Sequence, residues 1–523
     1  MSSVLDPDAG TVFVGGAGQG YATPETLLLK YANRHGLIAG ATGTGKTVTL
    51  QTLAESLSLA GVPVFLSDIK GDLSGLACAG RSDFKLHDAF TKRADQIGCT
   101  LDYQSFPVTF WDVWGELGHP VRTTPAEMGP LLLSRLLDLT AAQEGVMNIA
   151  FRVADQDGLP LLDLKDLQAM LVWVGQNAAD LSLRYGNVSP ASVGAIQRAL
   201  LVLENEGGDR LFGEPALELS DLIRQDASGK GVINILAAER LMNAPKLYAT
   251  FLLWLLSELF EQLPEVGDPD RPRIAFFFDE AHLLFDDAPK ALIDKVERVA
   301  RLIRSKGVSV WFVSQNPADI PESVLGQLGN RVQHALRSFT AKDQKALRLA
   351  AENYRPNPEF DIAEAIQQVG TGEAVTSFLG AKGTPGIAQR TLIRPPFSQL
   401  GPIDQATRAD ILKKSPQGLK YDRPLDRESA HEILAKRTAE AARQAEAEIA
   451  KRSDDDLFDM SPGDGHRNAR RYEAPKPDKQ ATRRSSRSDR VLETFGKSLA
   501  RQLGTRTGQA LVRGVLGSLL KGR

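Results

Sequence analysis

The chain has 523 residues, 42% of them hydrophobic and 24% charged, and a formal net charge of −3. A chain of this length and composition can bury a large core, so we expect a globular protein with more than one structural unit. Its two cysteines, Cys78 and Cys99, exclude a disulfide framework, and no CxxC spacing indicates a zinc or redox motif. The N-terminal MSSVLDPDAG lacks the basic and apolar regions of a signal peptide, so the expected compartment is the cytoplasm.

Charge is distributed unevenly along the chain. Residues 466–523 hold 15 Lys and Arg against 4 Asp and Glu, a net charge of +11, whereas the rest of the chain carries −14. The sequence therefore predicts a basic tail on an acidic body.

The first element with a chemical signature is GATGTGKT at residues 40–47, which fits the phosphate-loop pattern G-x-x-x-x-G-K-[ST]. An apolar run, GLIAG, precedes it and a helical pattern, VTLQTLAESL, follows, which makes a chance Gly-rich turn the weaker interpretation. Glycines let several backbone N–H groups point at one phosphate, and the helix adds its positive end. The predicted nucleotide-binding residues are Gly43, Thr44, Gly45, Lys46, Thr47 and Val48.

The same loop predicts the cofactors ATP and Mg²⁺. Lys46 is expected to reach the β- and γ-phosphates, and the Thr47 hydroxyl is expected to be a ligand of Mg²⁺.

Several short runs rich in Val, Ile, Phe or Leu are typical of strands buried on both faces of a parallel sheet. They lie at residues 62–68, 231–238, 273–280 and 308–316. Helical segments separate them, so we predict an α/β core with a mostly parallel, doubly wound sheet. Ligands bind at the carboxyl ends of such strands, where Asp68, Asp279, Glu280 and Gln315 fall.

The run RIAFFFDEAH, at 273–282, supplies the second half of the predicted site. Asp279 is expected near Mg²⁺ and its water shell, and Glu280 where it can polarise the attacking water. The alternative is that both acids cap the next helix, but the phosphate loop favours catalysis. The letters DEAH also label superfamily 2 helicases, whose second recombinase-like domain has no counterpart in the pattern.

Helical spacing, composition and charge divide the chain into six predicted segments. They are the first part of a P-loop ATPase core (1–114), a mainly helical insertion (115–230), the second part of the core (231–427), a charged helix (428–452), a disordered linker (453–490) and a basic amphipathic C-terminal helix (491–523). The apolar stretch 248–260 is too short to span a bilayer, so no membrane span is expected. The terminal helix is expected to pack on this protein or a neighbouring subunit; a membrane surface and nucleic acid are the alternatives.

Four stretches in combination resemble the standalone HerA-like bacterial ATPases of the HerA/FtsK superfamily, whose characterised members are hexameric DNA translocases. The stretches are SDIKGDLSGL (67–76), PVRTTPAEMGPLLLSRLLDL (120–139), VARLIRSKGVSVWFVSQNPADIPESVLGQLGNRVQHALR (299–337) and ARQLGTRTGQALVRGVLGSLL (500–520). The resemblance spans nearly the whole chain and implies a RecA-like P-loop core.

The resemblance also implies roles for two further catalytic residues. Gln315 would sense the γ-phosphate, and Arg304 would be an arginine finger that reaches a neighbouring subunit's site. A solvated helix end is the alternative role for Arg304, and Arg331 is a second candidate for the finger. Two departures are visible: Asn316 stands where the superfamily usually has Arg, and only 39 residues precede Gly40, too few for the N-terminal β-barrel of HerA proteins.

We therefore expect a P-loop ATPase that forms a homo-oligomer, a hexameric ring, and moves along duplex DNA as a translocase or helicase-like motor. A nuclease or another protein is a further possible partner. The acidic body argues gently against DNA contact. The alternatives are an ATPase that acts on protein partners, of the secretion or assembly type, and a nucleotide-gated oligomeric scaffold.

Overall fold

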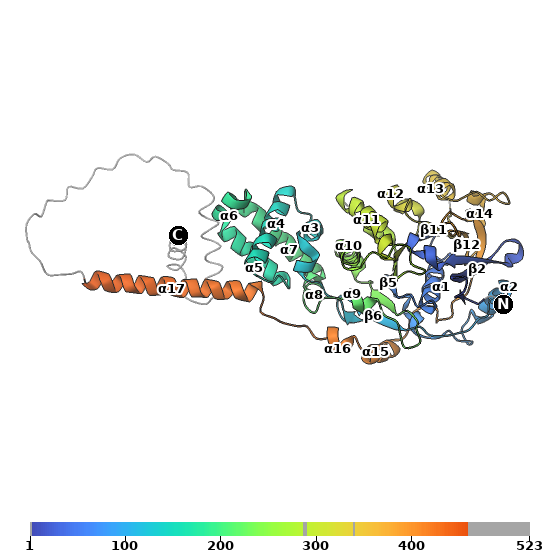
Figure 1. The fold of residues 1–523 in the computed structure, drawn as a ribbon, viewed down its shortest axis with the longest axis horizontal. Helices are drawn as coiled ribbons and strands as arrows, with labels where there is room; N and C mark the ends of the chain where they lie inside the picture. The colour runs from blue at the N-terminus through green and yellow to red at the C-terminus, as the bar shows by residue number, and fades with distance from the viewer. Residues whose placement is uncertain (1–2, 286–289, 338–339, 459–523) are drawn as a thin grey trace, which may run out of the picture. The chain divides into compact units, whose positions relative to one another are not determined.

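The computed structural model describes residues 3–285, 290–337 and 340–458 (Figure 1). The chain divides into two units, residues 1–427 and 428–523. Helix α17 (Ala430–Phe458) belongs to the second unit. The predicted terminal helix at 491–523, and the predicted linker beyond residue 458, lie outside the described residues.

The first unit is built on one mixed, largely parallel sheet, which confirms the predicted α/β core. Its parallel strands, in spatial order, are β11 (Asn330–Gln333), β4 (Gly36–Ala39), β10 (Val308–Ser314), β9 (Ile274–Phe278), β5 (Val64–Asp68), β8 (Ile233–Ala237), β6 (Val108–Asp112) and β7 (His119–Pro120). β10 pairs in parallel with both β4 and β9. The strand before the phosphate loop and the strand before Asp279 are therefore separated by one strand, and their carboxyl ends meet at one edge.

An antiparallel flank extends the sheet beyond β11. It contains β12 (Glu373–Ser377), β13 (Gln389–Ile393), β2 (Thr11–Ala17), β3 (Thr23–Leu28) and β1 (Leu5–Asp6). β13 pairs with β2, so residues from near the start of the chain and from after the core complete the same sheet. The strand sequences EAVTS and QRTLI show little apolar periodicity, so the sequence pattern alone does not identify them. Their burial depends on the neighbouring elements that cover them.

Helices cover the sheet and form a separate cluster (Figure 1). Those around the sheet are α1 (Lys46–Leu59), α2 (His87–Gln96), α9 (Leu219–Leu222), α10 (Pro245–Gln262), α11 (Lys290–Ile303), α12 (Glu322–Leu325), α13 (Ala341–Glu352), α14 (Ile362–Gln368), α15 (Gln405–Lys414) and α16 (Gly418–Tyr421). Nearly every residue of α10 from Leu247 to Leu259 is buried. Among the described residues, no helix has both the length and the apolar character needed to cross a membrane.

The cluster contains α3 (Pro125–Leu136), α4 (Ala141–Gln156), α5 (Leu164–Gln176), α6 (Ala178–Tyr185), α7 (Pro190–Leu203) and α8 (Asp209–Leu211). Thr124, Thr140 and Asp163 start three of these helices with capping boxes, which satisfy first-turn N–H groups. α4, α5 and α7 contact one another, and α3 contacts both α4 and α10. The cluster thus has its own apolar core and is joined to the helices of the sheet through α3.

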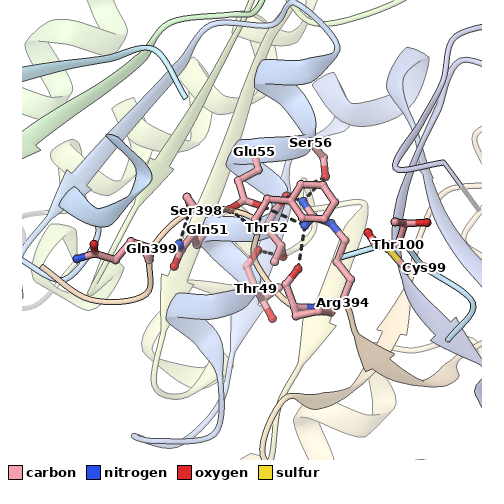
Figure 2. A network of polar contacts seen from close by, with 12 residues as sticks. Thr49, Gln51, Thr52, Glu55, Ser56, Cys99, Thr100, Arg394, Ser398 and Gln399 are labelled. Carbon is pink, nitrogen blue, oxygen red and sulfur yellow. Dashed lines mark hydrogen bonds and ion pairs between the residues drawn. The ribbon is translucent and has the colours of Figure 1, made fainter. Parts of the chain in front are cut away.

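A buried ion pair anchors α1, the helix that follows the phosphate loop (Figure 2). Arg394 Nη1 lies 2.9 Å from Glu55 Oε2, and both side chains are fully buried. Arg394 also donates to the Thr52 carbonyl and the Ser56 hydroxyl. Glu55 accepts from the Ser398 N–H and hydroxyl. Because both charges have several partners, the segment after β13 is locked against α1.

Replacing Arg394 by Met is expected to lower the free energy of unfolding by about 3–5 kcal/mol, because Glu55 would stay buried without its cation. The measurement is urea unfolding followed by tryptophan fluorescence. Lys414→Met is the matched control: Lys414 forms an exposed i,i+4 pair with Asp410, so its loss should cost less than about 1 kcal/mol. Equal unfolding midpoints for the two variants would contradict an anchoring role.

Candidate active site

The phosphate loop joins β4 to α1 in a conformation that requires glycine. Gly40 and Gly45 have φ of +151° and +115°. A Cβ atom on Gly40 would lie 2.5 Å from His334 Cβ, and one on Gly45 would lie 3.1 Å from Gly372 Cα. α1 begins at Lys46, so its free N–H groups face the loop. Lys46 Nζ donates to the Gly40 carbonyl at 2.6 Å, which holds the amine over the loop.

A support beneath the loop comes from the ends of β11 and β12. Gly372 N–H donates to the Thr44 carbonyl at 2.9 Å. His334 lies 2.8 Å from the Thr49 hydroxyl through Nε2 and 3.0 Å from the Glu373 carbonyl through Nδ1. Burial lowers the pKa of His334 to about 4, so the ring is neutral at physiological pH. No motif in the sequence singled out His334, because its partners are distant along the chain.

The acids after β9 are held by contacts with β5 and α10. Ser67 Oγ accepts from the Asp279 N–H at 3.1 Å and from the Tyr248 hydroxyl at 2.8 Å. Burial raises the pKa of Asp279 to about 6. Glu280 has a left-handed backbone (φ 47°, ψ 50°), which is rare outside glycine and is typical of strained functional sites.

The Glu280 carboxylate collects three side-chain contacts. Lys70 Nζ lies 2.7 Å from Oε1, while Gln315 Nε2 and His282 Nδ1 each lie 3.3 Å from Oε2. Burial raises the pKa of Glu280, but the hydrogen bond and charge of Lys70 outweigh burial and hold the pKa below its ordinary value. Sequence reasoning placed Glu280 and Gln315 at the carboxyl ends of strands, but it assigned no role to Lys70.

The side chains around Thr47 fit a magnesium ion bound together with nucleotide phosphates. Burial raises the pKa of Asp72, while the charge of Lys70 and the nearby Thr47 side chain oppose that shift. Asp72 Oδ1 is buried and has no hydrogen-bond partner among the residues that the structure describes. Hydroxyl and carboxylate oxygens are hard donors of the kind that Mg²⁺ prefers. Within the described ranges no group of three His, Cys, Asp or Glu could hold a metal, so the ion would need phosphate oxygens.

The sheet brings most of the predicted site residues to one edge. Lys46 interacts electrostatically with Asp279, Glu280 and Lys70, and burial with the Lys70 charge lowers the pKa of Lys46. Thr47 and Val48 follow Lys46 in the first turn of α1. The loop from Gly43 to Gly45 lies between β4 and that turn.

Arg304 lies away from these residues. It starts the 3₁₀ turn η7 (Arg304–Lys306), just before β10, and therefore at the opposite edge of the sheet from Gln315. Its Nη2 lies 3.1 Å from Asp268 Oδ1, and about a third of the side chain is exposed. Arg331 instead donates to the carbonyls of Leu328, Asn353 and Leu325, which gives it a structural role in this chain. Asn316 caps the next turn by accepting from the Ala318 N–H.

Comparison with known proteins identifies the family to which this chain is similar. The profile of the family "Helicase HerA-like C-terminal" matches residues 17–523. "Probable helicase MJECL08" of Methanocaldococcus jannaschii is 28% identical over 153 residues, 27% of this chain and 28% of that protein. "DNA double-strand break repair helicase HerA" of Sulfolobus acidocaldarius is 31% identical over 98 residues, 18% of this chain and 19% of that protein. The matched stretches thus span less than a third of each curated relative.

Among solved structures, the "bacterial conjugative coupling protein TrwBdeltaN70" is 15% identical with a TM-score of 0.47, over 74% of this chain and 89% of that one. VirB4 of Thermoanaerobacter pseudethanolicus is 16% identical with a TM-score of 0.47, over 75% of this chain and 98% of that one.

The neutral histidines predict how stability depends on pH. Burial lowers the pKa of both His334 and His35 to about 4. His35 Nδ1 accepts from the Val310 N–H and Nε2 faces the Ala300 carbonyl, so a charged ring would point one N–H at another. Between pH 6.5 and 4 the unfolded chain binds protons that the folded chain does not, so stability should fall by about 3 kcal/mol per histidine.

Urea unfolding at several pH values between 7.5 and 4.5 checks this expectation. His334→Asn should lose less stability than the wild type as the pH falls, whatever its stability at pH 7.5. Parallel pH dependences for the two proteins would show that His334 does not contribute.

Proposed function

The chain belongs to the HerA-like helicase family, and from that premise we propose that it is an ATP-driven, ring-forming motor that translocates along duplex DNA. Family membership makes it a P-loop enzyme that hydrolyses nucleoside triphosphates, as its phosphate loop predicts. The choice of ATP and Mg²⁺, the hexameric ring, the DNA substrate and the cytoplasmic location are parts of the proposal.

The observation that carries the proposal is the cluster of Lys46, Asp279, Glu280 and Gln315 at the carboxyl edge of one parallel sheet. In the proposed reaction, the loop N–H groups and Lys46 bind the phosphates of ATP. Thr47 and Asp279 would hold Mg²⁺, which when bound neutralises charge on the β- and γ-phosphate oxygens. Glu280 takes a proton from the attacking water, and Gln315 contacts the γ-phosphate.

The proposed ring accounts for the location of Arg304. Its position before β10 separates it from the site of its own chain, and its partly exposed guanidinium is available to a neighbouring copy once Asp268 releases it. An arginine supplied in trans stabilises charge in the phosphoryl-transfer transition state and makes hydrolysis depend on assembly.

Duplex DNA is the proposed substrate because both matched curated relatives are named as helicases, one of them a DNA double-strand break repair helicase. The net charge of −14 outside the basic tail favours one alternative, an ATPase that acts on a protein partner. A nucleotide-gated scaffold is the other, and a nuclease is a candidate partner of the motor.

Hydrolysis measured with and without duplex DNA tests the proposal. Wild-type turnover is expected to rise with DNA and to fall as salt increases, since phosphate contacts are screened. Glu280→Gln should lower kcat by about 10²–10⁴-fold, because the variant cannot take the proton. Turnover that does not change when DNA is added at low and moderate salt would favour the ATPase that acts on a protein partner. A function preserved in Glu280→Gln would favour the nucleotide-gated scaffold.

Mixing two inactive variants tests the arginine finger. Arg304→Ala is expected to lower kcat by about 10³-fold or more. An equal mixture of Arg304→Ala and Glu280→Gln subunits should regain part of the activity, because some interfaces combine an intact Glu280 with an intact Arg304. Lys46→Met mixed with Glu280→Gln is the control that should show no rescue, since both side chains belong to the same site. Unchanged activity in Arg304→Ala would show that Arg304 only pairs with Asp268 and has no catalytic role.

A further inference from the structure

The loop after β5 places a lysine on the proposed catalytic glutamate. Asp68 accepts from the Gly71 N–H at 2.8 Å and from the Leu73 N–H at 3.0 Å, so the backbone of this loop is fixed. Lys70 projects from it and pairs with Glu280 at 2.7 Å. The Lys70 side chain is 41% exposed, whereas that of Glu280 is 6% exposed. A flexible, half-exposed cation thus holds a buried anion.

The contacts of Glu280 oppose its action as a general base. Lys70 occupies Oε1, and Gln315 and His282 lie against Oε2. A general base must lie within hydrogen-bond reach of the proton it takes, with a lone pair available. The Lys70 ammonium reduces the number of lone pairs that are available on the carboxylate. In this arrangement Glu280 is poorly placed to accept a proton from water.

Lys70 also faces the region where the terminal phosphate would bind. Burial lowers the pKa of Lys46, the residue over the phosphate loop, and the charge of Lys70 lowers it further, so the two ammonium groups share one region of the site. Asp279 and Asp72 also interact with Lys70. Even with Mg²⁺ bound, a γ-phosphate next to Lys46 would bring additional negative charge to this region. It would therefore compete with Glu280 for Lys70.

We propose that Lys70 is a positioning residue that suppresses Glu280 until a nucleoside triphosphate binds, and that it then exchanges the Glu280 carboxylate for the γ-phosphate. This inference rests on the ATPase function proposed above. After the exchange, Glu280 takes a proton from water as the water oxygen bonds to the γ-phosphorus. The bond from that phosphorus to the bridging oxygen breaks, and ADP leaves with the electron pair. Nucleoside diphosphate lacks the competing anion and leaves the Lys70–Glu280 pair intact.

The first test compares nucleotide affinities of the full chain, measured by displacement of a fluorescent nucleotide. In the wild type, a non-hydrolysable triphosphate analogue gains a contact with Lys70 that ADP lacks. Lys70→Met should therefore reduce the ratio of analogue affinity to ADP affinity by about tenfold, equivalent to one charge-assisted contact. Lys70→Arg should retain most of the ratio because it keeps the charge. Lys414→Met is the surface control and should leave the ratio unchanged.

The second test is how the loss of activity in Lys70→Met is divided between KM and kcat. Because Lys70 would contact the γ-phosphate in the bound triphosphate as well as in the transition state, Lys70→Met should raise KM for ATP more than it changes kcat, and Lys70→Arg should raise it less. A merely structural ion pair predicts otherwise: the affinities for ADP and for the triphosphate analogue would change together. Lys70→Gln provides a second neutral variant if Lys70→Met is unstable in thermal unfolding.

These outcomes separate the two proposals. A wild type that does not hydrolyse ATP, or whose turnover does not depend on Glu280, overturns the proposed function. A wild type with Glu280-dependent turnover, but with the same affinity ratio and the same KM for ATP in Lys70→Met, overturns only the role of Lys70.

Discussion

The ion pair between Glu55 and Arg394 is the constraint on which the geometry of the phosphate loop depends. Both groups are removed from water, so the pair persists only because carbonyl, hydroxyl and amide partners surround it. Glu55 lies in the same helix as Lys46 and Thr47. The segment after β13 therefore fixes α1, and with it the residues that would hold phosphate and magnesium. The antiparallel flank thus contains no proposed catalytic residue, yet it fixes where α1 places the residues of the phosphate loop.

Strand order explains why Glu280 and Gln315 lie together whereas Arg304 lies apart from them. With β10 between β4 and β9, Gln315 and Glu280 leave adjacent strands at the same edge and come within 3.3 Å. The same parallel direction puts Arg304 at the other edge, because it precedes β10. One geometry thus completes part of the site within a chain and leaves the arginine apart from it, where the proposed ring would bring it to another copy.

The charge state of the buried carboxylates at the site depends on both burial and nearby cations. Burial raises the pKa of Asp68 to about 7 and of Asp279 to about 6, whereas Lys70 holds that of Glu280 below its ordinary value. Carboxylates in one low-dielectric site cannot all ionise without cations. In the proposed mechanism, binding of a nucleotide and a divalent ion would change the charge around Glu280, so the nucleotide state would control Glu280.

The sequence by itself determined the elements whose signals lie within about ten consecutive residues: the phosphate loop, the apolar strands and the acids after β9. It therefore predicted the α/β core and the family, both of which are confirmed, and it named the site residues that the sheet gathers. Only the tertiary structure decided which distant side chains meet. Lys70 and Glu280 are 210 residues apart, Thr49 and His334 are 285, and Glu55 and Arg394 are 339. Such contacts follow from strand order and register, and spacing along a chain encodes neither.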